Sequence, residues 1–193
     1  MALPACGGGE PDAAVVVAVV SQPCARPHRD RGVGVLLRSG LVATAAHTVD
    51  GPLRELTVDG APAHVVVLDA RTDLALLSAD VTGPPAPITM ADIGHGTVRT
   101  PDGDQDVDVL RTGPLIVDDI TAGVRHERSV HTFTPGVEPG TSGAPLVDDD
   151  GRVAGIVVLT NRTDGTAYAV TAAELNAVRD EARSSAAPVG CPG

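Results

Sequence analysis

The nine residues Pro139-Gly140-Thr141-Ser142-Gly143-Ala144-Pro145-Leu146-Val147 decide how the rest of this sequence is interpreted. A serine stands close to two glycines, prolines flank it, and an apolar run follows. Glycine permits backbone conformations that a Cβ would block, so such a turn can expose a hydroxyl and point successive N–H groups into one small space. That geometry suits an oxyanion hole. Gly-x-Ser-Gly also occurs in ordinary turns, so this stretch needs support from elsewhere in the chain.

Two upstream stretches supply that support. Residues 41–47, Leu-Val-Ala-Thr-Ala-Ala-His, read as an apolar strand that ends in His47. Residues 71–77, Arg-Thr-Asp-Leu-Ala-Leu-Leu, read as an apolar strand that Asp73 opens. A base, an orienting carboxylate and a nucleophile therefore occur in the order His, Asp, Ser, each at the edge of a strand-like segment.

The three motifs resemble those of the chymotrypsin-like, or trypsin-like, serine peptidases. The resemblance rests on Thr44-Ala45-Ala46-His47, on Thr72-Asp73-Leu74-Ala75-Leu76-Leu77 and on Gly140-Thr141-Ser142-Gly143-Ala144-Pro145-Leu146. It implies a serine endopeptidase that acts on a protein or peptide through an acyl-enzyme and needs no cofactor. Ser142 would be the nucleophile, His47 the general base and Asp73 its orienting partner, with the oxyanion bound by the N–H groups of Gly140 and Ser142.

Strand-like segments separated by Gly, Pro and Asp turns run through most of the chain. We expect about six strands in residues 13–88 and about seven in 89–170, with 106–111 and 115–121 as separate strands around a turn at 112–114. Asp148–Gly151 is interpreted as a hairpin turn and not as a metal site. The predicted class is all-β, with two six-to-seven-stranded antiparallel barrels and the site in the cleft between them.

The ends of the chain have their own signals. Residues 1–12 are rich in Gly and Pro and are expected to be a disordered leader or tether, which leaves 13–193 as the peptidase domain. Thr171-Ala172-Ala173-Glu174 reads as a capping box, and the apolar spacing after it predicts a helix over 171–184. Residues 185–193 would form a tail.

Composition restricts the partners. The net charge of −11 argues against nucleic-acid binding and against an anionic membrane face. The longest apolar run, 13–20, is too short to span a bilayer, so no transmembrane helix is expected. We expect a monomer without a metal ion. The remaining histidines have no comparable motif and are expected on the surface or in loops: His28, His64, His95, His126 and His131.

Three cysteines bear on the cellular location, and none lies in a C-x-x-C pair. A disulfide between Cys24 and Cys191 would close a long loop, and free thiols are the alternative. Such a bond implies an oxidising, extracytoplasmic compartment. Cys6, followed by three glycines, resembles the lipidated cysteine of a bacterial lipoprotein, although no basic and apolar signal regions precede it. Cys6 is therefore a candidate for a lipid anchor.

The segment Gly165-Thr166-Ala167-Tyr168-Ala169-Val170-Thr171-Ala172, followed by the expected helix and a cysteine near the end, resembles actinobacterial periplasmic serine proteases such as the mycobacterial acid-resistance protease. In that group a cysteine near the first strand bonds to one at the C-terminus, which is the pairing of Cys24 with Cys191. The family's usual aspartate before the serine is Thr141 here, so we infer no trypsin-style zymogen switch. By resemblance the primary pocket would prefer a small or apolar side chain. Its expected lining is Gly136, Val157, Val158, Leu159 and Gly165.

Two other interpretations stay open at this point. The chain could have the same fold without turnover and serve as an extracytoplasmic binding module. Alternatively, it could be a small β-sandwich in which the three motifs coincide by chance.

Overall fold

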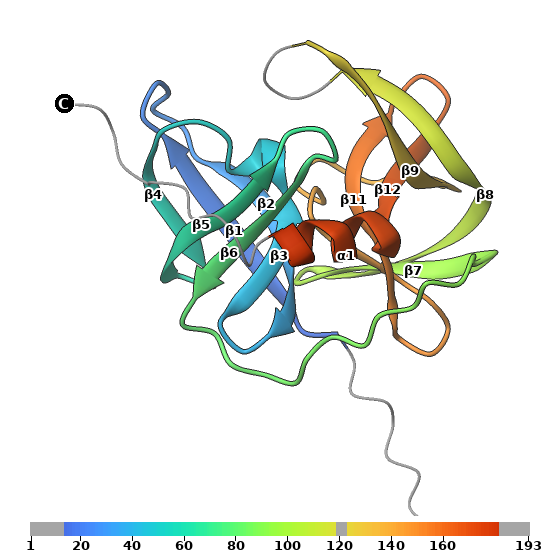
Figure 1. Cartoon of the computed structure of the whole chain (residues 1–193), viewed down its shortest axis with the longest axis horizontal. Coiled ribbons are helices and arrows are strands. Elements are labelled where there is room, and N and C mark those ends of the chain that lie inside the picture. The colour runs from blue at the N-terminus through green and yellow to red at the C-terminus, as the bar shows by residue number, and fades with distance from the viewer. Residues whose placement is uncertain (1–13, 119–122, 182–193) are drawn as a thin grey trace, which may run out of the picture.

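A computed structural model describes residues 14–118 and 123–181, whose strands form two closed antiparallel barrels lying side by side (Figure 1). The first has the strand order β1-β2-β3-β6-β5-β4 and the second β10-β11-β12-β9-β8-β7. The prediction of an all-β double barrel is therefore confirmed. The strands of the first are β1 (Val16–Pro23), β2 (Asp30–Arg38), β3 (Leu41–Ala45), β4 (Leu53–Val58), β5 (Ala61–Asp69) and β6 (Leu74–Ala79). Those of the second are β7 (His95–Thr100), β8 (Gly103–Asp118), β9 (Arg125–Thr134), β10 (Pro145–Val147), β11 (Val153–Asn161) and β12 (Thr166–Thr171).

The apolar core has three parts, one inside each barrel and one at the seam between them. Alternate residues of β6 belong to different parts: Ala75 and Leu77 pack inside the first barrel, while Leu74 and Leu76 pack at the seam. The seam cluster also includes Ile156 of the second barrel. A strand that is buried on both faces must be apolar throughout, which explains the continuous apolar run at 74–77 in β6.

Helix α1 (Ala172–Glu181) packs on the seam through Leu175 and Val178, which are both buried in the shared cluster (Figure 1). The capping-box prediction is wrong. The side chain of Glu174 accepts a hydrogen bond from the N–H of Ser129, and Thr171 Oγ1 has no hydrogen-bond partner among the described residues. Residues 182–184 of the expected helix lie outside the described residues. No helix in the described ranges is long and apolar enough to cross a membrane.

Strand β8 is longer than the sequence suggested. It runs from Gly103 to Asp118 without a break, so the expected turn at 112–114 is absent and the second barrel has six strands. Strand β7 pairs only with residues 103–108 of β8, whereas β9 pairs with its whole second half. Pro114 therefore lies where β8 has a neighbour on one side only, and a missing N–H is tolerated there.

The acidic segment after β10 is a hairpin turn, as expected. The side chain of Asp148 accepts hydrogen bonds from the N–H groups of Asp150 and Arg152, at 3.0 and 2.8 Å. Arg152 Nε also lies 2.8 Å from the same carboxylate. The charge of Asp148 is thus used within the turn itself.

Candidate active site

His47 and Asp73 meet because they extend two neighbouring strands. His47 lies in the short 3-10 turn η1 (Ala46–Thr48) directly after β3, and Asp73 directly precedes β6. Ala45 and Leu74 are paired in the ladder between β3 and β6. His47, two residues after Ala45, therefore lies close to Asp73, which directly precedes Leu74. The N–H of His47 donates to Asp73 Oδ1 at 2.8 Å, and His47 Nδ1 lies 2.7 Å from Asp73 Oδ2. Both oxygens of the Asp73 carboxylate thus contact His47, one at its backbone and one at its ring.

These contacts determine what the imidazole can do. A carboxylate only accepts hydrogen bonds, so Nδ1 of His47 carries the hydrogen and Nε2 is left as an acceptor. Nε2 lies 2.9 Å from Ser142 Oγ of the second barrel. The Asp73 side chain is 7% exposed, whereas the His47 side chain is 37% exposed, so the carboxylate is shielded and the imidazole is accessible from solution. The three side chains form one hydrogen-bonded line across the seam.

Backbone contacts hold the loop that carries Ser142, between β9 and β10. The carbonyl of Ser142 accepts a hydrogen bond from Val33 N–H of the first barrel at 2.8 Å, and Gly143 N–H donates to Val157 O at 2.7 Å. Gly143 has φ +89°, and a Cβ there would collide with Val33 O and Thr44 Oγ1. Only glycine satisfies both the conformation and the space at this position.

The same loop presents two N–H groups. Gly140 has φ +94°. Thr141 N–H donates to Glu138 O at 3.3 Å, whereas the N–H groups of Gly140 and Ser142 have no acceptor among the described residues. Two available donors beside a hydroxyl are what an oxyanion hole requires. Thr141 is buried, and the loop adopts this arrangement with threonine in place of the family's usual aspartate.

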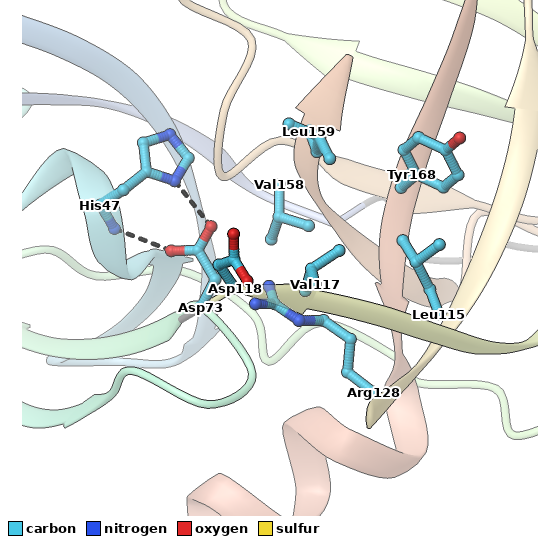
Figure 2. Close-up of a pocket in the computed structure, with 9 residues that line it drawn as sticks. All are labelled: His47, Asp73, Leu115, Val117, Asp118, Arg128, Val158, Leu159 and Tyr168. Carbon is cyan, nitrogen blue, oxygen red and sulfur yellow. Dashed lines mark hydrogen bonds and ion pairs between the residues drawn. The ribbon is translucent and has the colours of Figure 1, made fainter. Parts of the chain in front are cut away.

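A largely apolar cavity of about 290 Å³ adjoins His47 and Asp73 (Figure 2). Val158 and Leu159, two of the predicted pocket residues, line it, and Leu159 is 46% exposed. Sequence reasoning missed the others, although the apolar run at 115–117 of β8 gave a signal for two of them. The missed residues are Leu115, Val117, Asp118, Arg128 and Tyr168.

The other predicted pocket residues lie elsewhere. Gly136 N–H donates to Gly165 O at 2.7 Å, so these two segments are directly joined. Thr160 adjoins the first of these segments: its hydroxyl donates to Val137 O at 3.3 Å, and its Cγ2 is 3.2 Å from the position of a Cβ on Gly136. The Val157 side chain is 1% exposed and packs inside the second barrel. The space expected for a primary pocket is therefore narrow.

A second and more polar cavity, of about 640 Å³, is lined in part by the serine loop. The loop contributes Pro139, Gly140 and Thr141 to it, and Gly32 and Val33 contribute from the first barrel. Its charged residues are Arg31, Asp102, Asp104 and Glu138. The two cavities share no lining residue.

His131 departs from the expectation that it lies on the surface. It is 2% exposed within the second barrel, where Nε2 donates to Ala154 O at 3.1 Å and Nδ1 accepts from Thr112 Oγ1 at 2.8 Å. Burial lowers the pKa of His131, because the low-polarity surroundings disfavour the charged ring. The ring is thus a structural hydrogen-bonding group away from the serine.

Some predicted residues cannot be placed. Cys6 and Cys191 lie outside the described residues, so the disulfide and the lipid anchor stay predictions. Cys24 follows β1, and its N–H donates to Pro52 O at 2.9 Å. Within 14–118 and 123–181, no group of three His, Cys, Asp or Glu side chains could hold a metal ion.

The fold and the histidine–aspartate–serine line define a class, and the chain belongs to the family with a trypsin-like peptidase domain, whose model matches residues 32–156. The resemblance seen in the motifs is thereby confirmed. No curated protein sequence matches the chain.

Solved structures show the same likeness. The chain is similar to the active form of the Rv3671c protease from M. tuberculosis, with 28% identity and a TM-score of 0.81 over 94% of this chain and 84% of that one. An inactive form of that protease, a serine-to-alanine mutant, has 26% identity and a TM-score of 0.70 over 91% and 89%. The HtrA-type protease AlgW with a tripeptide shares the fold, with 19% identity and a TM-score of 0.69 over 89% and 60%.

Proposed function

We propose that the chain is a serine endopeptidase. The observation that carries the proposal is the line from Asp73 Oδ2 through the His47 ring to Ser142 Oγ, with contacts of 2.7 and 2.9 Å. His47 Nε2 takes the hydroxyl proton while Ser142 Oγ bonds to the carbonyl carbon of a peptide. The N–H groups of Gly140 and Ser142 stabilise the negative oxygen that results.

The second half of the cycle uses the same groups. His47 gives its proton to the amine nitrogen as the C–N bond breaks, which leaves an acyl group on Ser142. Water then attacks this ester with His47 as the base, and the carboxylic acid leaves. Asp73 keeps the ring in the required tautomer and stabilises its charged form. The higher TM-score to the active than to the inactive form of the mycobacterial protease supports a site that is already assembled.

Thr160 gives the proposal its side-chain preference. Its Cγ2 is 3.2 Å from the position of a Cβ on Gly136, and its hydroxyl donates to Val137 O, in the region where the family resemblance places the primary pocket. A large side chain would collide with Thr160, so the residue that donates the scissile carbonyl should be small. The apolar cavity beside His47 would accept a larger apolar side chain elsewhere on the substrate.

We also infer that the enzyme works outside the cytoplasm as a monomer. A disulfide between Cys24 and Cys191 would require an oxidising compartment, and Cys6 would carry a lipid anchor. Mass spectrometry under non-reducing conditions tests the bond. A peptide that links Cys24 to Cys191 is expected, and alkylated thiols at both positions would contradict the assignment.

A peptide library with cleavage sites mapped by mass spectrometry tests the function. The wild type should cleave after small residues, Ser142→Ala should cleave nothing, and Thr160→Gly should extend cleavage to larger side chains. Thr163→Gly, at an exposed loop position, is the matched control and should keep the wild-type preference. A folded wild type that cleaves no peptide would contradict the proposal and favour a binding module.

A further inference from the structure

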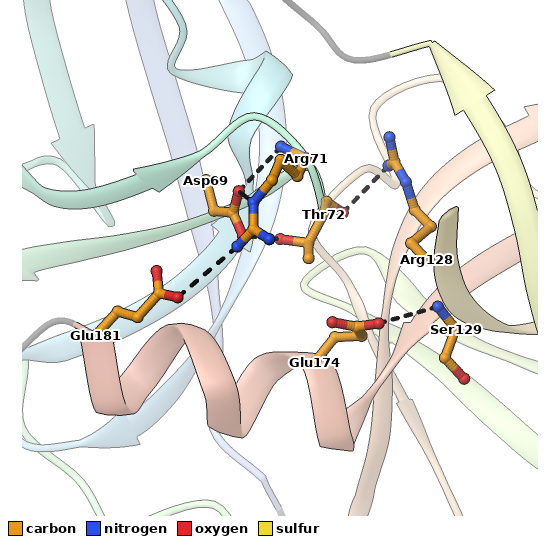
Figure 3. A network of polar contacts seen from close by, with 7 residues as sticks. All are labelled: Asp69, Arg71, Thr72, Arg128, Ser129, Glu174 and Glu181. Atoms are coloured by element: carbon orange, nitrogen blue, oxygen red, sulfur yellow. Dashed lines mark hydrogen bonds and ion pairs between the residues drawn. The ribbon is translucent and has the colours of Figure 1, made fainter. Parts of the chain in front are cut away.

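Arg128 is a buried arginine that reaches out of its own barrel. It lies on β9 of the second barrel and is 4% exposed. Arginine is rarely so buried unless it has partners. Its Nη1 donates a hydrogen bond of 3.1 Å to the carbonyl oxygen of Thr72, in the first-barrel loop (Figure 3). This contact crosses the seam at the residue that precedes Asp73.

The position of that carbonyl determines how the Asp73 side chain is presented. The Thr72 carbonyl belongs to the peptide plane that joins Thr72 to Asp73, and φ of Asp73 relates this plane to the Asp73 side chain. That angle is +61°, in the left-handed region that few residues other than glycine adopt. Such a conformation persists when the surroundings fix it from several directions. Arg128 supplies one of these fixed points.

The first barrel supplies other fixed points. The carboxylate of Asp69, which is 7% exposed, accepts hydrogen bonds from Arg71 N–H at 2.9 Å and from Thr72 Oγ1 at 3.1 Å. After the loop, Ala46 N–H donates to Asp73 O at 2.9 Å. The loop is therefore held before and after the Thr72–Asp73 peptide by its own barrel, and the peptide itself is held from the other one.

Helix α1 holds the strand that carries Arg128. Glu174 of this helix accepts a hydrogen bond of 3.1 Å from the N–H of Ser129, the residue after Arg128 (Figure 3). At the other end of the helix, Glu181 lies 3.7 Å from the guanidinium of Arg71. The helix thus contacts both the strand that carries Arg128 and the loop that carries Asp73.

We propose that Arg128 is a positioning residue for Asp73, an inference that rests on the proposed function. By fixing the Thr72 carbonyl from the second barrel, it keeps the Asp73 carboxylate in place to bind His47. The alignment of the base then depends on how the two barrels pack, and not on the first barrel alone. Arg128 also lines the cavity beside His47, so truncation of its side chain would leave a space that opens into this cavity.

Substitutions that separate charge, length and donor geometry test this role. Arg128→Met should lower kcat about 10- to 100-fold with little change in KM, the effect expected when a reacting group is misplaced. Arg128→Lys should fall between Arg128→Met and the wild type. Guanidinium ions, but not urea, should restore part of the activity of Arg128→Ala. Arg111→Met, at an exposed position on the neighbouring strand β8, is the control and should keep the wild-type kcat.

Proton NMR provides a readout that does not depend on turnover. The hydrogen on His47 Nδ1 should give a strongly downfield signal in the wild type, and this signal should weaken in Arg128→Met at unchanged melting temperature. A folded Arg128→Met enzyme with wild-type kcat and signal would overturn the proposal. If that variant does not fold, a folded Arg128→Lys enzyme with wild-type kcat and signal overturns it. An inactive wild type would instead contradict the proposed function.

Discussion

The two barrels hold their parts of the site by different means. The first barrel presents His47 and Asp73, whose side chains bond to each other and to neighbouring backbone groups. The second barrel presents Ser142 on a loop that is fixed by backbone hydrogen bonds and by the absence of a side chain at Gly143. The first half should therefore be sensitive to changes of chemical groups, and the second half to added volume.

The largest expected effect tests the first half. Asp73→Asn keeps the shape but places an amide where the His47 ring needs an acceptor, so the wrong tautomer is favoured. We expect kcat to fall about 10⁴-fold with an unchanged melting temperature. Asp80→Asn, an exposed aspartate at the end of the first barrel, is the control. A loss of less than tenfold in Asp73→Asn would contradict the role of the carboxylate.

The next effect tests the second half. Gly143→Ala places a Cβ against Val33 O and Thr44 Oγ1 in a backbone conformation that alanine disfavours. Urea unfolding should show a loss of about 3 kcal/mol or more, from overpacking and the positive φ together. Gly151→Ala has φ +76° but open space around the new Cβ, so it should lose only about 1–2 kcal/mol. Equal losses in the two variants would show that the collision is unimportant.

A pH dependence of folding should arise in the second barrel. The pKa of buried His131 lies below 6.5, so the unfolded chain binds a proton that the folded chain does not as the pH falls through this value. The contribution of the neutral His131 ring to the free energy of unfolding should be fully present above pH 6.5. It should decrease below that pH, by at most about 1.4 kcal/mol per pH unit.

Urea unfolding between pH 8 and pH 5 measures this contribution. His131→Gln should remove part of the pH dependence, whereas His28→Gln, at an exposed position, should leave it unchanged. An identical pH dependence in the wild type and His131→Gln would contradict the assignment.

The smallest effect concerns the apolar cavity between the two halves. Leu115→Ala removes apolar surface that would contact a substrate side chain, so KM for peptides with a large apolar residue should rise about tenfold or less. Ile116→Ala, the next residue along β8, is 64% exposed and should leave KM unchanged. Equal KM values for the two variants would exclude the cavity as part of the substrate site.

The sequence allowed the double barrel and the residues of the hydrogen-bonded line to be predicted because their signals are local. His47 and Asp73 each adjoin an apolar run that is buried on both faces, and Ser142 lies in a distinctive glycine turn. The roles of these residues in catalysis remain predictions. Arg128 could not be predicted in this way, because it reaches the site only through the packing of one barrel on the other.

Two local patterns gave wrong predictions for a similar reason. Glu174 follows a threonine at capping-box spacing, but a backbone N–H of β9 lies within its reach and forms the observed hydrogen bond. The proline in β8 indicated a turn, but the strand has only one neighbour at that point and continues through it. In both cases contacts with a neighbouring strand determined the local structure, and such contacts cannot be read from a local sequence pattern.

The central claim is that His47 activates Ser142 across the seam between the barrels. The most direct measurement is the rate at which a fluorophosphonate modifies the protein, with the modified residue identified by mass spectrometry. The account predicts a single adduct on Ser142. The adduct should form at least about 100-fold more slowly in His47→Ala, because a general base contributes about 10²- to 10⁴-fold to the rate. A folded wild type that forms no adduct, or that reacts as fast without His47, would contradict the claim.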